Sequence, residues 1–256
     1  MIAAAALGLG TNAQLNSTGP VAALVNERLE RQATFVKASP FAIAGKSDVR
    51  DAVVQAVVDD ATVLKADPAA LAALLAARPE ELELRIPVQG GEVELQLVAT
   101  NIFADGFSVV TASTDLPYDH MPGLHYRGIV KGQPSTLAAI SIFKDEVMGL
   151  VTDAQGDHTL GKLDGSADEH VYYAVKDFKG AIDMGCATAD DGVGYSEEQL
   201  KAHGSAKTVN CVNLYWEVNY DVFQNKGSVT STTNYVTGLF NQSSTIYNND
   251  GISVLL

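Results

Sequence analysis

Alternating apolar and polar residues dominate the middle of the chain. Two segments, ELELRIPV at 81–88 and EVELQLVA at 92–99, alternate with a period of two and flank a Gln-Gly-Gly turn at 89–91. This pattern predicts a β-hairpin with one buried face. Further short apolar runs bounded by Gly, Pro, Asp or Asn predict more strands, at 107–113, 125–132, 135–143, 146–153 and 158–163. An antiparallel, β-rich domain is therefore expected.

Helical spacing is clearest after Asp67. Asp67 suits the N-cap, Pro68 suits the first helical position, and the apolar residues that follow keep a helical period until Pro79. Residues 19–38 predict either a helix or an extended segment, and residues 48–66 are ambiguous between helix and strand. One early helix with a mainly β domain around it is the expected arrangement.

The pattern changes towards the C-terminus. The stretch from Cys186 to Ser205 is rich in Gly, Asp and Ser, which predicts a linker. Alternate residues are apolar over 212–220, which indicates a half-buried strand. Residues 230–246 carry apolar or small side chains at helical spacing, and ISV follows Gly251. We therefore expect a parallel strand–helix–strand unit after the linker.

Both ends of the chain are those expected of a fragment. The apolar run 2–9 and the small residues Thr11 and Ala13 are typical of a secretory signal peptide that has lost its positive start. An alternative interpretation takes GLGTNA at 8–13 as a dinucleotide-binding fingerprint. The apolar run 252–256 would leave an unpaired strand edge. These features favour a secreted protein cut just after a second domain begins.

Composition narrows the classes of partner. The chain has 256 residues, with 17 Lys plus Arg against 31 Asp plus Glu, a formal net charge of -14. An acidic chain of this kind disfavours nucleic acid, which requires a basic face. The apolar runs are all too short for a transmembrane helix. A soluble, globular protein without a membrane span is expected.

Two blocks resemble a known family. The first is HYRG at 125–128, followed by the small and apolar run 135–143 and by Gly149-Leu-Val151. The second is VNLYWEVNYDVF at 212–223, followed by NYVTGLFNQSSTIYNNDGISV at 234–254. Together they resemble the secreted bacterial zinc metalloproteases of the reprolysin (adamalysin) branch of the metzincins. The first block resembles their prodomain and the second the opening of their catalytic domain.

The resemblance implies an α+β chain divided into four parts. Residues 1–13 would be a signal-peptide remnant, 14–185 a β-rich antiparallel propeptide domain, 186–206 a linker, and 207–256 the truncated start of an α/β catalytic domain. The propeptide of such a zymogen inhibits the protease and assists its folding. Its partner would be its own catalytic domain, and the full-length enzyme would act on proteins or peptides.

The zinc-binding motif of that family, H-E-x-x-H-x-x-G-x-x-H, is absent from this sequence. The chain has five histidines, none with a second histidine four residues away: His120, His125, His158, His170 and His203. Two histidines at that spacing share a helix face and bind zinc, and the glutamate acts as general base. We therefore expect no catalytic residue here and no protease activity for this chain alone, with Zn²⁺ held by the full-length protein.

The two cysteines, Cys186 and Cys211, leave three alternatives open. The resemblance implies that Cys186 could be a cysteine switch, a prodomain thiolate that ligates the catalytic zinc. The two could instead form a disulfide in an oxidising compartment. Finally, Cys211 could pair with a cysteine beyond the present sequence.

Other polar residues suggest weaker hypotheses. Glu217 and Asp221 could be calcium ligands, although the family position falls on Asn213, and solvent-facing strand residues are the simpler interpretation. The loop from Asp153 to Asp157, together with His158, could bind a cation, but a hairpin turn is the simpler interpretation. Arg127 is expected to be buried and paired with an acid. The alternative function is a secreted, non-catalytic β-rich binding or adhesion module.

Overall fold

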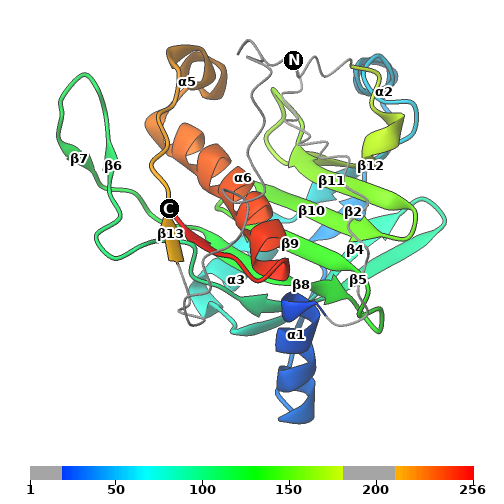
Figure 1. Cartoon of the computed structure of the whole chain (residues 1–256). Helices are drawn as coiled ribbons and strands as arrows, with labels where there is room; N and C mark the ends of the chain where they lie inside the picture. Colours follow the sequence, from blue (N-terminus) through cyan, green and yellow to red (C-terminus); the bar gives the residue numbers. More distant parts are fainter. Residues whose placement is uncertain (1–18, 181–210) are drawn as a thin grey trace, which may run out of the picture.

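The computed structural model describes residues 19–180 and 211–256, and its main element is one large curled sheet (Figure 1). The strands of this sheet are β1 (Val36–Ala38), β2 (Phe41–Ile43), β3 (Thr62–Ala66), β4 (Glu81–Val88), β5 (Gly91–Ala99), β8 (Leu124–Val130), β9 (Leu137–Ile142), β10 (Val147–Asp153), β11 (Gly156–Lys162) and β12 (Glu169–Ala174). Their order is β1-β4-β5-β8-β9-β10-β11-β12-β3-β2, and all neighbours are antiparallel except β1 and β4. The sheet curls until β2 contacts β4.

The remaining elements are short strands and helices. They are β6 (Val109–Val110), β7 (Pro117–Tyr118), β13 (Cys211–Asn213), β14 (Ser253–Leu255), α1 (Pro20–Glu30), α2 (Asp48–Gln55), α3 (Pro68–Ala77), α5 (Tyr220–Lys226), α6 (Val229–Asn249) and the 3₁₀ turn η1 (Val175–Asp177). The described chain is thus a mixed α/β structure built on an antiparallel-rich sheet, as its pattern predicted in outline.

The predicted hairpin is confirmed. β4 and β5 pair from Glu81 opposite Val98 to Val88 opposite Gly91, so Gln89 and Gly90 form the turn. Gly90 has φ +86°, a conformation that glycine adopts without a Cβ penalty. The strands predicted near 125–132, 135–143, 146–153 and 158–163 are also present, as β8 to β11.

Other expectations are corrected by the structure. The segment 107–113 contains only the two-residue strand β6, which pairs with β7 in a small separate ribbon. The ambiguous segment 48–66 contains both a helix and a strand, α2 and β3, and 19–38 likewise contains α1 and β1. β12 was not predicted at all. Short apolar runs give weak periodic signals, so tertiary pairing decides these elements.

The main core lies on the concave face of the curled sheet. Inward side chains of neighbouring strands, among them Leu84, Leu97, Tyr126 and Ile140, are buried there together with Leu71 of α3. α3 has the predicted cap, because the Asp67 carboxylate accepts hydrogen bonds from the backbone N–H groups of Ala69 and Ala70. α3 therefore belongs to the apolar interior.

Helices α1 and α6 lie on the opposite, outer face of the sheet (Figure 1). α1 buries Ala22 and Val25 against Val98 of β5 and Ile129 of β8. Because successive strand residues point to opposite faces, these positions alternate with inward residues such as Leu97. α6 crosses β8, β9 and β10 beside α1.

The C-terminal segment forms the expected parallel unit, with a shorter first strand. β13 pairs in parallel with β14, and α5 and α6 connect them. The strand expected over 212–220 ends at Asn213, and its later residues are exposed rather than half-buried. β14 is not the unpaired edge that the sequence suggested: Val254 and Leu256 pack against Ile102 and Phe240.

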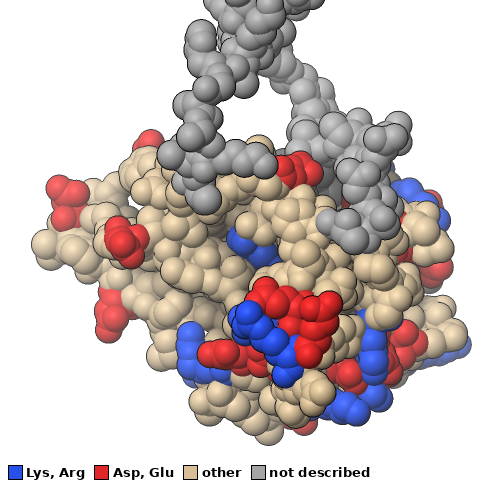
Figure 2. Space-filling model, turned by 60° about the horizontal axis from the view of Figure 1, so that its bottom comes forward, with Lys and Arg blue, Asp and Glu red and all other residues tan. Residues whose placement is uncertain are grey.

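The outer surface carries charges of both signs side by side (Figure 2). The buried Glu83 carboxylate of β4 pairs with Arg85 and with Lys131, which follows β8. Lys131 also pairs with Glu94 of β5. Within the described ranges, every helix is too short or too polar to cross a membrane.

Candidate functional site

Helix α6 meets the outer face of the sheet through an unusually polar contact, called here the α6 interface. It consists of the buried face of α6 and the outward residues of β8, β9 and β10. The buried residues of the helix are Thr232, Thr233, Asn234, Thr237, Gly238, Phe240, Asn241, Ser244 and Thr245. Phe240 is the one large apolar side chain in that set. Apolar stripes normally hold helices against sheets, so this interface requires another explanation.

The hydroxyl groups of α6 are satisfied within the helix. Thr232 Oγ1 donates to the carbonyl of Ser228 at 2.8 Å, and Thr237 Oγ1 donates to that of Thr233 at 2.8 Å. Thr245 Oγ1 donates to the carbonyl of Asn241 at 2.7 Å. These hydrogen bonds from residue i to the carbonyl of residue i−4 offset the cost of removing the hydroxyl groups from water. These hydroxyl groups therefore need no partner on the sheet, whereas the buried side-chain oxygens of Asn234 and Asn241 have no hydrogen-bond partner among the described residues.

Asn241 makes the most specific contact across the interface. Its Nδ2 lies 3.3 Å from the Tyr126 carbonyl oxygen, 3.1 Å from that of Ile140 and 3.1 Å from Ser141 Oγ. The amide thus donates to groups on both β8 and β9. Asn241 Oδ1 is buried and has no hydrogen-bond partner among the residues described. Asn241 consequently fixes the position of α6, but burial of its unpaired Oδ1 offsets part of the free energy that its hydrogen bonds contribute.

Arg127 of β8 is buried under the C-terminal half of α6, with 7% of its surface exposed. Its Nε donates to Thr245 Oγ1 at 3.1 Å and its Nη2 to Ser244 Oγ at 2.9 Å. The expected acid partner is wrong, because its printed partners are hydroxyls and no carboxylate in 19–180 or 211–256 forms an ion pair with it. Burial lowers the pKa of Arg127 to about 10.

His125 extends the polar contact away from the helix. Its Nδ1 lies 2.9 Å from Ser141 Oγ, the hydroxyl that also accepts from Asn241. Phe103 and Phe143 contact its ring edge-on. Burial lowers the pKa of His125 to about 3, and the nearby His120 and Arg127 add to this effect. The ring is therefore neutral at neutral pH.

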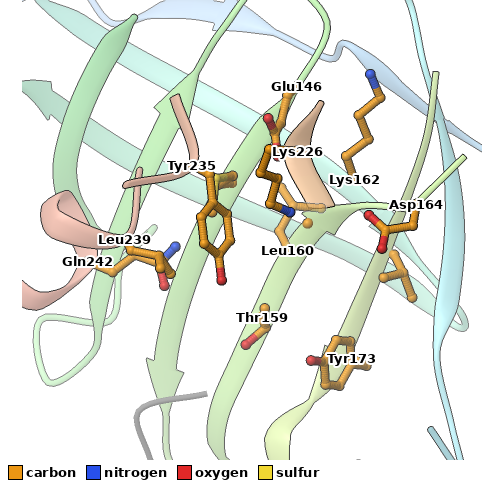
Figure 3. A pocket seen from close by; sticks show the side chains of 13 residues that line it. Glu146, Thr159, Leu160, Lys162, Asp164, Tyr173, Lys226, Tyr235, Leu239 and Gln242 are labelled. Atoms are coloured by element: carbon orange, nitrogen blue, oxygen red, sulfur yellow. The ribbon is translucent and has the colours of Figure 1, made fainter. Parts of the chain in front are cut away.

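A small hollow opens beneath the N-terminal half of α6 (Figure 3). It encloses about 50 Å³ between β10–β12 and the two C-terminal helices, and both parts of the chain line it. Lys226 Nζ lies 4.1 Å from the centre of the Tyr235 ring, a cation–π contact. Burial raises the pKa of Glu146, which faces this hollow, while Lys226 acts in the opposite direction. The α6 interface is thus closed at one end and hollow at the other.

Gly238 lets α6 approach the sheet closely between these two ends. A Cβ at this position would lie 2.7 Å from Met148 Sδ and 3.5 Å from the Phe143 ring. A side chain here would displace Met148 or move the helix.

The residues singled out in the sequence do not form a site together. Cys186 lies outside the described residues, so the cysteine switch and the Cys186–Cys211 disulfide both stay predictions; Cys211 is exposed on β13. Glu217 and Asp221 are exposed as well. In the 153–157 turn, Asp153 Oδ1 accepts from the Gln155 backbone, as a hairpin turn requires.

The described part of the chain contains no preformed site for zinc or calcium. No group of three or more His, Cys, Asp or Glu side chains lies close enough to hold a metal ion within residues 19–180 and 211–256. The side chains of these two ranges therefore do not form a metal centre.

Sequence reasoning missed Asn241, Ser244 and Thr245 as interface residues. The signal was present, because the helix 229–249 is rich in Ser, Thr and Asn rather than in Leu or Ile. Arg127 was recognised as buried, but its partners lie more than a hundred residues away in sequence. Comparison with models of protein families found no match, and comparison with curated proteins found none either.

Proposed function

We propose that this chain is a precursor fragment of a secreted zinc-dependent metalloendopeptidase. In this proposal residues 14–185 form the propeptide and residues 207–256 begin the catalytic domain. The propeptide assists folding of the catalytic domain and inhibits it, and the working enzyme cleaves proteins or peptides. The zinc ligands belong to the full-length protein, and Ca²⁺ is a second metal of that protein in this proposal.

The observation that carries the proposal is the β13–α6–β14 unit. The resemblance implied a strand, a helix and a parallel strand over these residues, and a parallel pair is present there. Parallel sheets are usually covered on both faces and contain more than two strands. The residues after β13 expose large apolar side chains, among them Tyr215 and Tyr220 at 86% and 69% exposure. Such a unit is suited to join a larger α/β domain.

The seating of α6 supports an inhibitory role for the preceding body. Strands β8 to β10 contact the first long helix of the unit, and α1 contacts the same helix. A propeptide that holds the first helix of its protease can template folding and restrict the motions needed for activity. This follows from a contact between the two parts rather than from a metal ligand.

The proposal is tested on the gene and on its product. We expect the coding sequence after Leu256 to encode an H-E-x-x-H helix. The product that includes this helix should cleave casein in a chelator-sensitive manner once the propeptide is removed. The 256-residue chain supplied with zinc should not cleave casein. A gene without that helix, or robust cleavage by the 256-residue chain alone, would refute the proposal.

A further inference from the structure

We propose that the hollow beneath α6 binds a small zwitterionic amino acid, of the size of glycine or alanine. Within the described ranges, three polar groups without a hydrogen bond or ion pair face this space (Figure 3): the Tyr173 hydroxyl, the Glu146 carboxyl and the Lys226 ammonium. A ligand that carries one ammonium and one carboxylate group provides partners for all three. This inference goes beyond the proposed function and does not depend on it.

The Tyr173 hydroxyl is the best-defined of the three groups. Tyr173 lines the hollow from β12 with 3% of its surface exposed, and its oxygen has no hydrogen-bond partner among the residues described. Burial raises the pKa of this phenol, and Thr159, its neighbour on β11, acts in the opposite direction. A buried hydroxyl without a partner destabilises a fold, so its position beside a hollow indicates a donor for a bound acceptor.

Two opposite charges face the same hollow without forming an ion pair. Glu146 lies in the β9–β10 turn, and no hydrogen bond or ion pair reaches its carboxyl from the residues of 19–180 and 211–256. Lys226 ends α5 and contacts the Tyr235 ring, but its ammonium pairs with no carboxylate of those ranges. Charges partly removed from water favour ligands that carry the complementary charge.

The balance of charge favours a zwitterion over a simple ion. Lys162 and Asp164 also line the hollow, so two cations and two anions border it, and Lys162 already pairs with Asp145. A simple anion would leave the Glu146 carboxyl without a partner, and a simple cation would leave the Lys226 ammonium without one. An amino acid provides an ammonium for the first and a carboxylate for the second, and the same carboxylate can accept from Tyr173.

The size of the hollow limits the ligand. Its volume of about 50 Å³ corresponds to roughly four water molecules, or to one organic molecule of similar size. The apolar part of the wall consists of Met148, Leu160, Val171 and Leu239. A methyl group can contact this wall, whereas a large side chain would overfill the space. We therefore expect alanine to bind severalfold more tightly than glycine, and phenylalanine to bind worst.

The ligand would contact both parts of the chain. Glu146 and Tyr173 belong to the sheet and its turns, whereas Lys226 and Gln242 belong to the C-terminal helices. Because the hollow forms only while these helices lie on the sheet, the ligand binds the folded chain and not the unfolded one. Binding should therefore raise the melting temperature and stabilise the α6 interface.

The experiment titrates the full 256-residue chain, which carries isotope-labelled tyrosine, with alanine, glycine, phenylalanine, acetate or methylamine. The ring signals of Tyr173 and Tyr235 report occupancy of the hollow by nuclear magnetic resonance, and Tyr173→Phe and Tyr235→Phe assign them. We expect saturable shifts with alanine and a dissociation constant of about 1 mM or below. Acetate and methylamine carry one charge each and should bind at least about tenfold more weakly.

Three substitutions test the assigned groups. Glu146→Gln and Lys226→Met each remove one charge and should weaken alanine binding at least about tenfold. Tyr173→Phe should weaken it severalfold, while the melting temperature of the free chain stays the same or rises, because an unpaired buried hydroxyl is removed. Lys144→Met, at an exposed site in the same turn as Glu146, is the matched control and should leave the affinity unchanged.

Circular dichroism checks that each variant is folded. Glu146→Gln and Tyr173→Phe are nearly isosteric with the parent residues, so they decide the question even if Lys226→Met does not fold.

The inference fails if alanine shifts neither tyrosine ring at about 50 mM, where a site of millimolar affinity would be filled and the hollow would then hold water alone. It also fails if acetate or methylamine binds as tightly as alanine, because one charge would then suffice. Unchanged affinity in all the lining variants would place binding elsewhere and overturn it as well. A gene without the H-E-x-x-H helix would refute the proposed function and leave these titrations unaffected.

Discussion

The two faces of the curled sheet are built from the same strands and hold their helices by different means. On the concave face, Tyr126 and Ile140 join a continuous apolar core with α3. On the outer face, their sequence neighbours Arg127 and Ser141 meet α6 through hydrogen bonds. Alternation along a strand is all that separates these two environments.

This difference assigns different tasks to the two faces. The concave face buries aliphatic side chains with a large and non-directional gain in free energy, so it determines whether the body folds. The outer face gains less energy from each contact but depends on the positions of individual donors and acceptors. It therefore selects which helix lies on it and in what register.

The largest effect should come from adjacent substitutions that sample both faces. Ile140→Ala removes a fully buried side chain from the core and should lower the free energy of unfolding by about 2–5 kcal/mol. Ser141→Ala removes one hydroxyl from the outer face and should cost about 1 kcal/mol. Urea unfolding of the full chain measures both. Equal losses would contradict the division between the two faces.

Acid should destabilise both faces through one buried histidine on each. His170 on the concave side accepts a hydrogen bond from the Val147 backbone at Nε2, and burial lowers its pKa to about 4. The folded-state pKa values of His170 and His125 lie below the unfolded value near 6.5, so the unfolded chain binds more protons at acid pH. Stability is then complete above pH 6.5 and falls as the pH approaches 4, by about 2 kcal/mol per histidine at pH 5.

The measurement is urea unfolding at pH 7 and at pH 5 for the parent chain, His125→Gln and His170→Gln. Each variant should lose part of the pH dependence, irrespective of its stability at pH 7. An unchanged difference between the two pH values in both variants would show that other groups control the acid response.

The smallest effect should come from the hollow end of the α6 interface. Lys226→Met removes the cation over the Tyr235 ring and should lower the free energy of unfolding by about 0.5–1 kcal/mol. Lys144→Met, at an exposed site in the β9–β10 turn, is the control and should change it by less than about 0.5 kcal/mol. A larger loss for Lys226→Met than for Ser141→Ala would reverse the order of the two ends.

The sequence predicted the elements whose local pattern is strong. The 81–99 hairpin alternates over its whole length, and Asp67-Pro68 marks the start of α3 by capping chemistry. β12 was missed and the strand over 212–220 was overestimated, because short apolar runs depend on which strand lies beside them. The alternation over 212–220 correctly indicated a strand, but the pairing with β14 covers only Cys211 to Asn213 and one further hydrogen bond, from the Leu214 N–H to the Leu255 carbonyl.

The candidate site was less accessible to sequence reasoning. Arg127 and Asn241 were visible as a polar strand residue and a helical Asn, but nothing local indicates that both face the same interface. Their meeting depends on the tertiary placement of α6 on β8, more than a hundred residues from Arg127 in sequence. The pattern of apolar and polar residues over 212–254 predicted the order of the C-terminal elements, and the contact of α6 with the sheet came from the structure.

The short segment after β5 connects the last strand with the buried imidazole. Ile102 accepts a hydrogen bond from the backbone N–H of Leu256, and the adjacent Phe103 ring lies 5.6 Å from that of His125. A displacement of the C-terminal strand must therefore shift an aromatic ring next to this histidine. The ring protons of His125 consequently provide a spectroscopic reporter, by nuclear magnetic resonance, of whether the chain terminus is seated.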